Sequence, residues 1–169
     1  YVYKNTQKSY RDLPYRMSET STLFRSEDSG EMHGLTRVRQ FTITEAHNVI
    51  RPDQAEEELK NCFDLAYYVL STLGLQDDVT YRLSKWDPAN KKKYLGDEDY
   101  WNRTQEALRE VLREKGVPFV EADGEAAFYG PKIDIQAKNV YGKEDTMITI
   151  QLDCAIAENF DLYYIDQNG

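Results

Sequence analysis

The sequence predicts an α+β fold in which an antiparallel β-sheet is flanked by helices. Stretches of alternating apolar and polar residues lie towards both ends of the chain, and two segments with helical periodicity lie between them. Strands joined by short turns pair antiparallel, and helices then cover one face of their sheet. The 169 residues, of which 40% are apolar and 30% charged, suit one globular domain with a sizeable core.

The first expected element is a hairpin with strands over residues 13–25 and 37–49, joined by a charged connection over 26–36. Residues of one parity share a face of a strand, at steps of roughly 7 Å. Such a row suits an elongated ligand with an anionic part, a flat part and a small polar part, and a hairpin edge with surface arginines is the alternative. In the second strand this face would carry Arg37, Arg39, Phe41, Ile43, Glu45, His47 and Val49.

The middle of the chain predicts two helices separated by a strand. The first helix follows Pro52, repeats apolar residues on one face and ends at Gly74. A strand is expected over residues 79–84, and a second helix over 97–115 begins with acidic residues that suit the positive end of the helix dipole. We interpret both helices as core-packing scaffolds. The lysine run 91–93 favours an exposed loop over a surface that touches RNA.

The last third of the chain predicts three short strands, over residues 119–122, 133–137 and 146–153. The first strand ends at a turn that contains Gly124, and the other two are joined by a turn that contains Gly142. These strands complete the antiparallel sheet of the expected fold.

Composition argues against several classes of function. The net charge of −9 argues against a protein wrapped in nucleic acid, so DNA is not an expected partner. No apolar run approaches the roughly 18 residues that a membrane span needs, so no membrane partner is expected. The cysteines Cys62 and Cys154 lie far apart and favour free thiols in a reducing compartment, which indicates a cytoplasmic location. No CxxC or HxxxH spacing occurs, so the chain alone offers no complete zinc site.

Three cations suggest an anion site. A guanidinium, as on Arg25 and Arg37, binds phosphate oxygens in a bidentate fork, while Lys132 would act as a mobile point charge. Phe41 offers a face on which a flat base can stack, and Glu27 can accept a hydrogen bond from an exocyclic amine. Neither GxxxxGK(S/T) nor GxGxxG occurs. The set therefore describes ATP held on an antiparallel sheet by side-chain clamps, with metal ions such as Mg²⁺.

A second group of residues suits an amino acid. Tyr129 and Gln151 can supply hydrogen bonds, and Glu45 or Asp153 can bind an ammonium group. A lone histidine such as His47 is more often a structural residue than a ligand, so the pattern alone leaves its role open.

Several segments carry a resemblance to a known family. The chain resembles motif 2 of class II aminoacyl-tRNA synthetases in three segments, FRSE at 24–27, RVRQF at 37–41 and EAH at 45–47. Within that class, it looks similar to threonyl-tRNA synthetases in four segments, SYRDLP at 9–14, HGLTRVR at 33–39, FYGPK at 128–132 and IQLD at 150–153. The resemblance extends in the same order over nearly the whole chain. It implies a partial class II catalytic core, in which residues 1–169 form the central part of a single catalytic domain.

At the ATP end, the resemblance implies that Arg25 binds the α-phosphate and the amino-acid carboxylate. Glu27 would face the adenine amine and Phe41 would stack on the adenine. Arg37 would reach the terminal phosphates.

At the amino-acid end, the resemblance implies that His47 is one of three Zn²⁺ ligands, the metal reading the amino and hydroxyl groups of threonine. Tyr129, Lys132 and Gln151 would line the threonine and adenylate pocket, and Glu45 would flank the substrate side chain.

The implied reaction is attack of the threonine carboxylate on the α-phosphorus of ATP, followed by transfer to tRNA(Thr), with Arg25, Arg37 and Lys132 as the catalytic cations. Motif 1, which builds a homodimer interface, and a zinc-binding cysteine would precede residue 1. Motif 3 and a further zinc-binding histidine would follow residue 169, and editing and anticodon-binding domains would also lie elsewhere. The chain alone is therefore expected to be inactive and zinc-free. Ile43 and Glu45 stand where the family usually has glutamine and aspartate, which leaves an alternative, a synthetase-like paralogue that binds an amino acid or RNA without aminoacylation.

Overall fold

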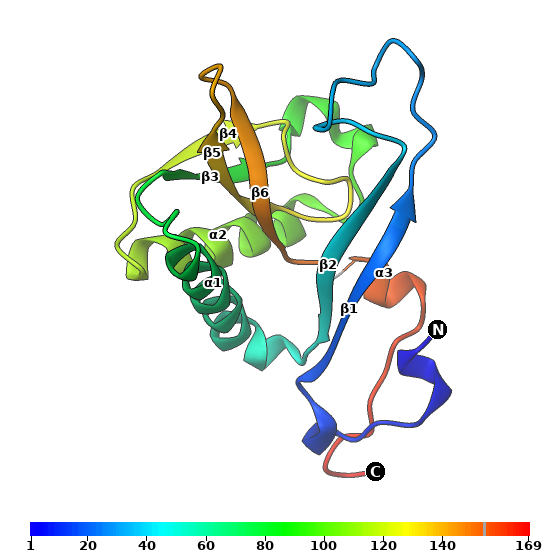
Figure 1. The fold of residues 1–169 in the computed structure, drawn as a ribbon. Helices are drawn as coiled ribbons and strands as arrows, with labels where there is room; N and C mark the ends of the chain where they lie inside the picture. The colour runs from blue at the N-terminus through cyan, green and yellow to red at the C-terminus, as the bar shows by residue number, and fades with distance from the viewer. Residues whose placement is uncertain (154) are drawn as a thin grey trace.

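The structure is a computed structural model that describes residues 1–153 and 155–169 (Figure 1). Its strands form two sheets, a two-stranded hairpin and a four-stranded sheet in the order β4-β3-β5-β6. The strands are β1 (Tyr15–Phe24), β2 (Gln40–Val49), β3 (Val79–Lys85), β4 (Phe119–Asp123), β5 (Lys132–Lys138) and β6 (Glu144–Gln151). β1 pairs with β2, and β5 with β3 and β6, in antiparallel fashion, which confirms the expected α+β fold.

One pairing at the edge of the larger sheet differs from the others, because β4 lies parallel to β3. The chain passes between these two strands through α2 (Glu98–Glu114). A helical crossover of this kind returns the chain in its original direction, so the sheet is mixed at this edge rather than wholly antiparallel.

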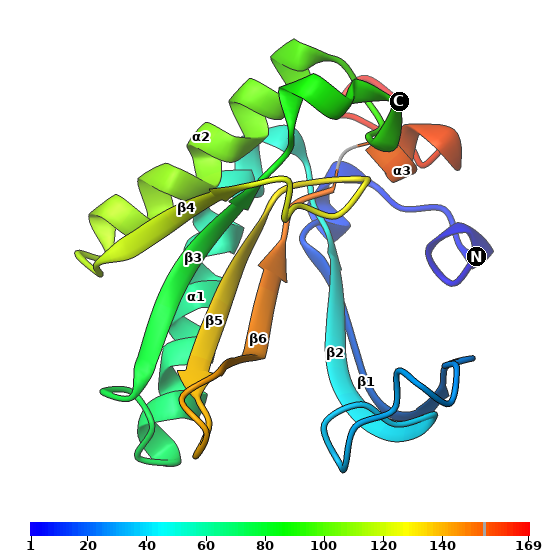
Figure 2. The same ribbon diagram turned by 90° about the horizontal axis from the view of Figure 1, so that it is seen from above.

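Helices α1 (Ala55–Thr72) and α2 cover one face of the four-stranded sheet (Figure 2). Leu83 of β3, Leu108 of α2 and Ile133 of β5 are fully buried between these layers. The Asp97 side chain accepts a hydrogen bond from the backbone N–H of Tyr100 at 2.7 Å and so caps the start of α2. Among the residues described, no helix is both long enough and apolar enough to cross a membrane.

Shorter helical elements complete the fold. They are four 3₁₀ segments, Tyr3–Asn5, Tyr10–Asp12, Pro52–Gln54 and Pro88–Lys93, and the helix α3 (Ala155–Asn159), which the sequence pattern does not predict. The lysine run 91–93 is exposed, as expected. Lys91 lies over the Trp86 ring, and Trp86 stacks on Trp101 with the ring centroids 5.6 Å apart. This aromatic cluster forms a second core beside the main one.

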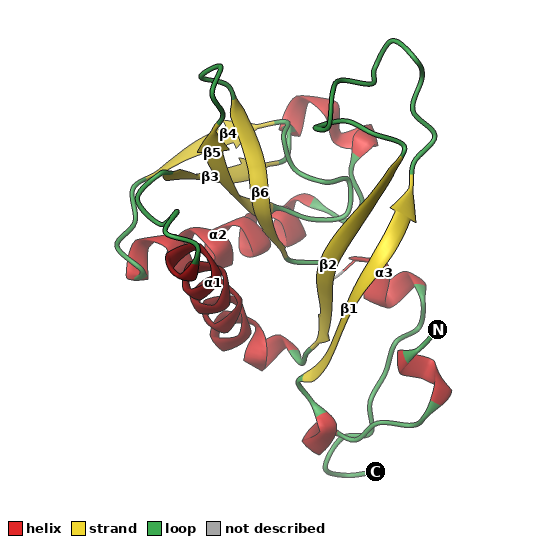
Figure 3. Cartoon of the chain, in the orientation of Figure 1, coloured by secondary structure: helices red, strands yellow, loops and turns green. Residues whose placement is uncertain are grey.

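The connection between β1 and β2 is longer than the sequence predicts, because β2 begins at Gln40 rather than at residue 37 (Figure 3). Arg37 forms a single β-bridge with His33, and Arg39 directs its side chain to the backbone oxygen of Glu27. Arg37 and Arg39 therefore lie before the start of β2, although parity assigned them to the strand.

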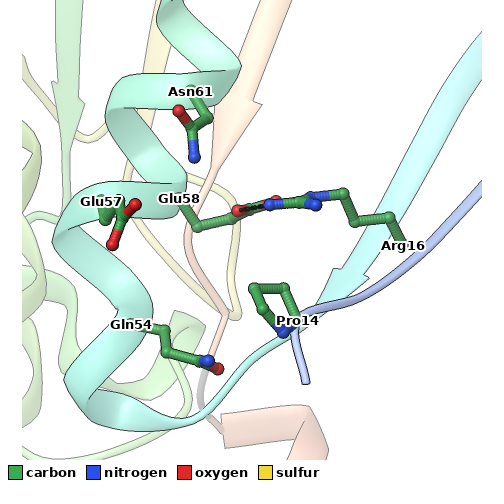
Figure 4. A pocket seen from close by; sticks show the side chains of 6 residues that line it. All are labelled: Pro14, Arg16, Gln54, Glu57, Glu58 and Asn61. Carbon is green, nitrogen blue, oxygen red and sulfur yellow. Dashed lines mark hydrogen bonds and ion pairs between the residues drawn. The ribbon is translucent and has the colours of Figure 1, made fainter. Parts of the chain in front are cut away.

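A polar clamp joins the hairpin to α1 at one end of the strands. Arg16 of β1 donates two hydrogen bonds of 2.6 Å to Glu58 of α1, and the two side chains point toward one another in Figure 4. Asn48, which lies opposite Arg16 on β2, donates to the same carboxylate at 2.9 Å. Asn48 also lies 3.6 Å from the sulfur of Cys62, a free half-buried thiol of α1. The other cysteine, Cys154, lies outside the described residues.

The two ends of the chain lie against one another, below the hairpin in Figure 1. The backbone N–H of Tyr10 donates to the oxygen of Ile165, and the N–H of Ile165 donates to the oxygen of Lys8, both at 2.8 Å. The Tyr3 hydroxyl adds a hydrogen bond of 3.0 Å to the backbone oxygen of Tyr163.

Candidate functional site

One face of the hairpin carries the residues that parity selected on β2. Phe41, Ile43 and Glu45 are half-buried, whereas the alternate residues Thr42 and Thr44 are exposed. Phe41 and His47 lie on the same face, six residues and roughly 20 Å apart along the strand.

Arg25 lies on this same face, one residue beyond the end of β1. Its backbone N–H donates to the oxygen of Arg39 at 2.8 Å, which extends the hairpin ladder. Its guanidinium carbon lies 5.0 Å from the centroid of the Phe41 ring. An exposed cation thus stands over an aromatic ring, and a flat anionic ligand can meet both groups at once.

Glu27 and Arg37 form an ion pair at the base of the connection. Glu27 accepts hydrogen bonds from Arg37 Nε at 3.0 Å and Nη2 at 2.9 Å. These hydrogen bonds hold the pKa of the Glu27 carboxyl below its ordinary value, so this carboxylate stays ionised at neutral pH. The Arg37 side chain is 52% exposed and therefore accessible to an anion from solvent.

A second group of site residues lies on the four-stranded sheet. Lys132 at the start of β5 pairs in register with Gln151 at the end of β6. The Tyr129 hydroxyl donates to Gln151 Oε1 at 2.6 Å, and the backbone oxygen of Tyr129 accepts a hydrogen bond from the Tyr100 hydroxyl at 2.7 Å. The Tyr129 hydroxyl therefore contacts the Gln151 amide, and Lys132 is the cross-strand neighbour of Gln151.

Gly130 allows the loop before β5 to approach the end of β6 closely. A Cβ atom on Gly130 would lie 2.0 Å from the backbone oxygen of Leu152, far inside van der Waals contact. The N–H of Leu152 donates to the oxygen of Pro131 at 3.3 Å across the same contact. Glycine is required here for a close approach, which positions Tyr129 and Lys132 against β6.

Asp153 follows β6 and is one of the two carboxylates that suit an ammonium group. Burial raises the pKa of its carboxyl above the ordinary value. One of its oxygens accepts a hydrogen bond from the backbone N–H of Ile156 at 2.9 Å, at the start of α3. Tyr129 lies near enough that, after its own burial, the Asp153 charge also raises the pKa of its hydroxyl.

The expected site residues thus fall into two groups. Arg25, Glu27, Arg37 and Phe41 meet at the loop end of the hairpin, and Tyr129, Lys132 and Gln151 meet on the larger sheet. Within residues 1–153 and 155–169, no hydrogen bond or ion pair joins the two groups. In both views β2 lies next to β6, the edge strand of the four-stranded sheet (Figures 1 and 2). Two small pockets lie elsewhere, one at the polar clamp and one beside Tyr3 and Tyr163.

Glu45 and His47 lie on the same face of the hairpin as Phe41, but further from the connection between the strands. His47 is exposed and lies opposite Met17 of β1. In the part of the chain that the structure describes, no three His, Cys, Asp or Glu side chains come together in a way that could hold a metal ion.

One buried charge was missed by reasoning from the sequence. Asp134 of β5 is fully buried, and its carboxylate contacts Lys132 and three other side chains. A signal was present, since a carboxylate stands between Ile133 and Ile135, two residues from a lysine on the same face of the strand.

Comparison with known proteins identifies the family. Residues 2–169 match the family described as "tRNA synthetase class II core domain (G, H, P, S and T)". The chain belongs to this family, which confirms the class that the hairpin and its Arg-x-Glu segment indicate.

The individual relatives that this chain is similar to are named for one amino acid, threonine. The chain is 61% identical to a threonine–tRNA ligase of Clostridium perfringens over 99% of its own length and 26% of the relative's length. It is 56% identical to a threonine–tRNA ligase of Clostridium botulinum over the same shares. The crystal structure of the RNA binding domain of threonyl-tRNA synthetase from Cryptosporidium parvum superposes with a TM-score of 0.87 at 34% identity, over 99% of this chain and 40% of that one. The chain thus spans about a quarter of the length of the curated relatives it matches, at 26%.

Proposed function

We propose that the protein to which this chain belongs is a threonine–tRNA ligase, and that residues 1–169 form the central part of its catalytic domain. The observation that carries the proposal is the hairpin face, on which the Arg25 guanidinium stands 5.0 Å from the Phe41 ring. The identity of 61% to a protein of that name supports the choice of amino acid.

In the proposed reaction, a carboxylate oxygen of threonine attacks the α-phosphorus of ATP. The bond from that phosphorus to the bridging oxygen breaks, and pyrophosphate leaves. Mg²⁺, when bound, would supply positive charge that offsets the charge of the phosphates. A ribose hydroxyl of tRNA(Thr) then attacks the carbonyl carbon of the adenylate, the bond from that carbon to the phosphate oxygen breaks, and AMP leaves with the hydroxyl proton on its phosphate. Each step passes through a centre with increased negative charge, so fixed cations stabilise the transition state more than the ground state.

The hairpin residues serve the nucleotide in this proposal. Phe41 stacks on the adenine, and Arg25, beside the same ring, binds the α-phosphate and the threonine carboxylate. Glu27 accepts from the adenine amine, and Arg37 turns toward the terminal phosphates. Because Glu27 and Arg37 pair with each other at 2.9 Å, binding ATP would replace part of that ion pair with contacts to the nucleotide.

The sheet residues serve the amino acid. Tyr129, Gln151 and Lys132 line the pocket for threonine and its adenylate, with Glu45 of the hairpin beside the substrate side chain. The described residues do not make a zinc site by themselves, since a catalytic zinc ion takes three protein ligands. We therefore propose His47 as one ligand, with the other two supplied from beyond this chain.

The partners proposed for the full-length protein are threonine, ATP and tRNA(Thr), together with a second copy of itself in a homodimer. Editing and anticodon-binding domains would lie outside residues 1–169, and the cytoplasm is the proposed location.

The test is threonine-dependent exchange of pyrophosphate into ATP by the full-length protein, followed by charging of tRNA(Thr). Arg25→Gln should lower the exchange rate by about 100-fold or more, because it removes a cation from the reacting phosphate. The matched control is Arg103→Gln on the exposed side of α2, which should leave the rate unchanged. Binding of threonine without charging of any tRNA would refute the proposal and favour the paralogue.

A further inference from the structure

The four-stranded sheet has one apolar and one polar face. Leu83, Ile133 and Ile150 turn toward α1 and α2 and form the main core. The alternate residues turn to the opposite face, which carries Arg82 and Ser84 of β3, Lys132 and Asp134 of β5, and Thr149 and Gln151 of β6.

Asp134 lies at the centre of this polar face, and four side chains from three strands contact it. Its Oδ2 accepts from Ser84 Oγ at 2.7 Å and from Arg82 Nη2 at 3.1 Å, and it lies 3.1 Å from Lys132 Nζ. Its Oδ1 accepts from Thr149 Oγ1 at 3.1 Å. The Asp134 side chain is 0% exposed, whereas those of Arg82 and Lys132 are 22% and 21% exposed. Both cations therefore reach the surface from a buried anion.

A buried carboxylate needs compensation that a neutral side chain would not. A buried charge persists only when cations or several strong donors accompany it. Burial alone would raise the pKa of the Asp134 carboxyl, yet the hydrogen bonds from Ser84 and Lys132 outweigh burial and lower it below its ordinary value. Asp134 is therefore ionised at neutral pH and attracts both cations.

The anion restricts a side chain that is otherwise mobile. Lysine carries a compact charge on a flexible four-carbon stem, so its ammonium group samples many positions unless a partner holds it. Lys132 also lies opposite Gln151, to which the Tyr129 hydroxyl donates. Asp134 thus holds the ammonium group of a lysine whose cross-strand neighbour, Gln151, lines the proposed substrate pocket.

We infer that Asp134 is a positioning residue, which holds the Lys132 ammonium group on the polar face of the sheet where the adenylate forms. The inference rests on the proposed function, because it assigns Lys132 to the adenylate pocket. Asp134 itself touches no substrate and acts through Lys132. Arg82 shares the same carboxylate oxygen, so the cluster of two cations and one anion presents a net positive charge to the open face.

A double-mutant cycle in the full-length protein tests the inference, with threonine-dependent pyrophosphate exchange as the assay. Asp134→Asn preserves the shape of the side chain but removes its charge, and it should lower kcat about 10- to 100-fold. In a Lys132→Met background, the same substitution should change kcat by less than about 2-fold, because the group it positions is already absent. Asp134→Glu, which restores a carboxylate, should recover part of the lost rate.

The matched control removes another Asp–Lys ion pair from the same sheet. Asp123 of β4 lies 3.0 Å from Lys85, and Asp123→Asn should leave exchange unchanged. If Asp134→Asn reduces the yield of folded protein, the cycle is run with Asp134→Glu, and coupling to Lys132 is still expected.

The possible failures are distinguishable. Equal losses from Asp134→Asn with and without Lys132 would overturn the inference, as would full activity of Asp134→Asn beside an impaired Lys132→Met variant. Absence of threonine-dependent exchange in the unsubstituted protein, or full activity of Lys132→Met, would instead refute the proposed function or the role of Lys132 in it.

Discussion

Substitution of Gly130 by alanine should damage the candidate site directly. The added Cβ would lie 2.0 Å from the oxygen and 3.1 Å from the carbon of the Leu152 carbonyl. Since carbon and oxygen atoms come into contact at roughly 3.3 Å, the loop and the end of β6 must separate by more than about 1 Å. The obstacle is backbone rather than a flexible side chain, so it cannot rotate away.

The separation should affect both stability and activity. Overpacking of this kind costs about 1–3 kcal/mol, and the hydrogen bond of 3.3 Å from Leu152 to Pro131 would be weakened as well. Tyr129 and Lys132 flank the substituted position, so both would move relative to Gln151. A misplacement of about 1 Å can lower a rate about 100-fold, and we expect a loss of that order in kcat/KM for pyrophosphate exchange.

Gly142→Ala is the matched control, assayed in the full-length protein by exchange kinetics and denaturant unfolding. Gly142 has a positive φ of 76° and nothing within 4 Å of its Cβ position, so alanine there costs about 1 kcal/mol through backbone strain alone. It should lose stability while keeping its exchange rate. If Gly130→Ala keeps the same exchange rate as Gly142→Ala, the close contact with Leu152 does not position the site.

Three further outcomes are expected. Phe41→Ala should raise the KM for ATP in pyrophosphate exchange about 10-fold, since stacking a base on a ring contributes about 1–3 kcal/mol, and an unchanged KM would exclude stacking on this ring. Hydrogen bonds from Arg109 lower the pKa of Glu121 to about 2. The Glu121 carboxylate therefore contributes to stability above its ordinary pKa, and this contribution is lost as pH falls toward 2. Denaturant unfolding measured against pH should show the loss of stability, and the loss should be smaller in Glu121→Gln. Glu58→Gln should cost about 1–3 kcal/mol by leaving Arg16 without its carboxylate, and hydrogen exchange should quicken in β1 and β2 more than in β3 and β5.

The sequence predicted those elements whose signals are local. Gly74 and the acidic start of the second helix marked helix boundaries to within a few residues, and parity correctly assigned Phe41 and His47 to one face of β2. The start of β2 was misplaced because Arg37 pairs with Glu27, a contact between residues at opposite ends of a loop. The expected antiparallel direction of β4 was wrong, because the helix between β3 and β4 returns the chain in its original direction and makes this pair parallel.

The candidate site divides in the same way. The sequence predicted residue types that suit ATP and an amino acid, whereas the assembly of these residues into two groups depends on strand register. The four contacts to Asp134 require β3, β5 and β6 to be aligned, which no single stretch of sequence specifies. The roles of the individual site residues stay predictions until variants are measured.

The polar clamp attaches the hairpin to α1 at the end of the strands that is far from the connection, so a small rotation there displaces the other end. Arg16 and Asn48 lie opposite each other, and both hold Glu58. Phe41 is seven residues further along β2, roughly 23 Å away. Tilting the hairpin about 10° at Glu58 would swing the Phe41 end by about 4 Å, since each strand rises roughly 3.3 Å per residue. Substitutions in the polar clamp should consequently displace the Phe41 end of the hairpin most, where the nucleotide is proposed to bind.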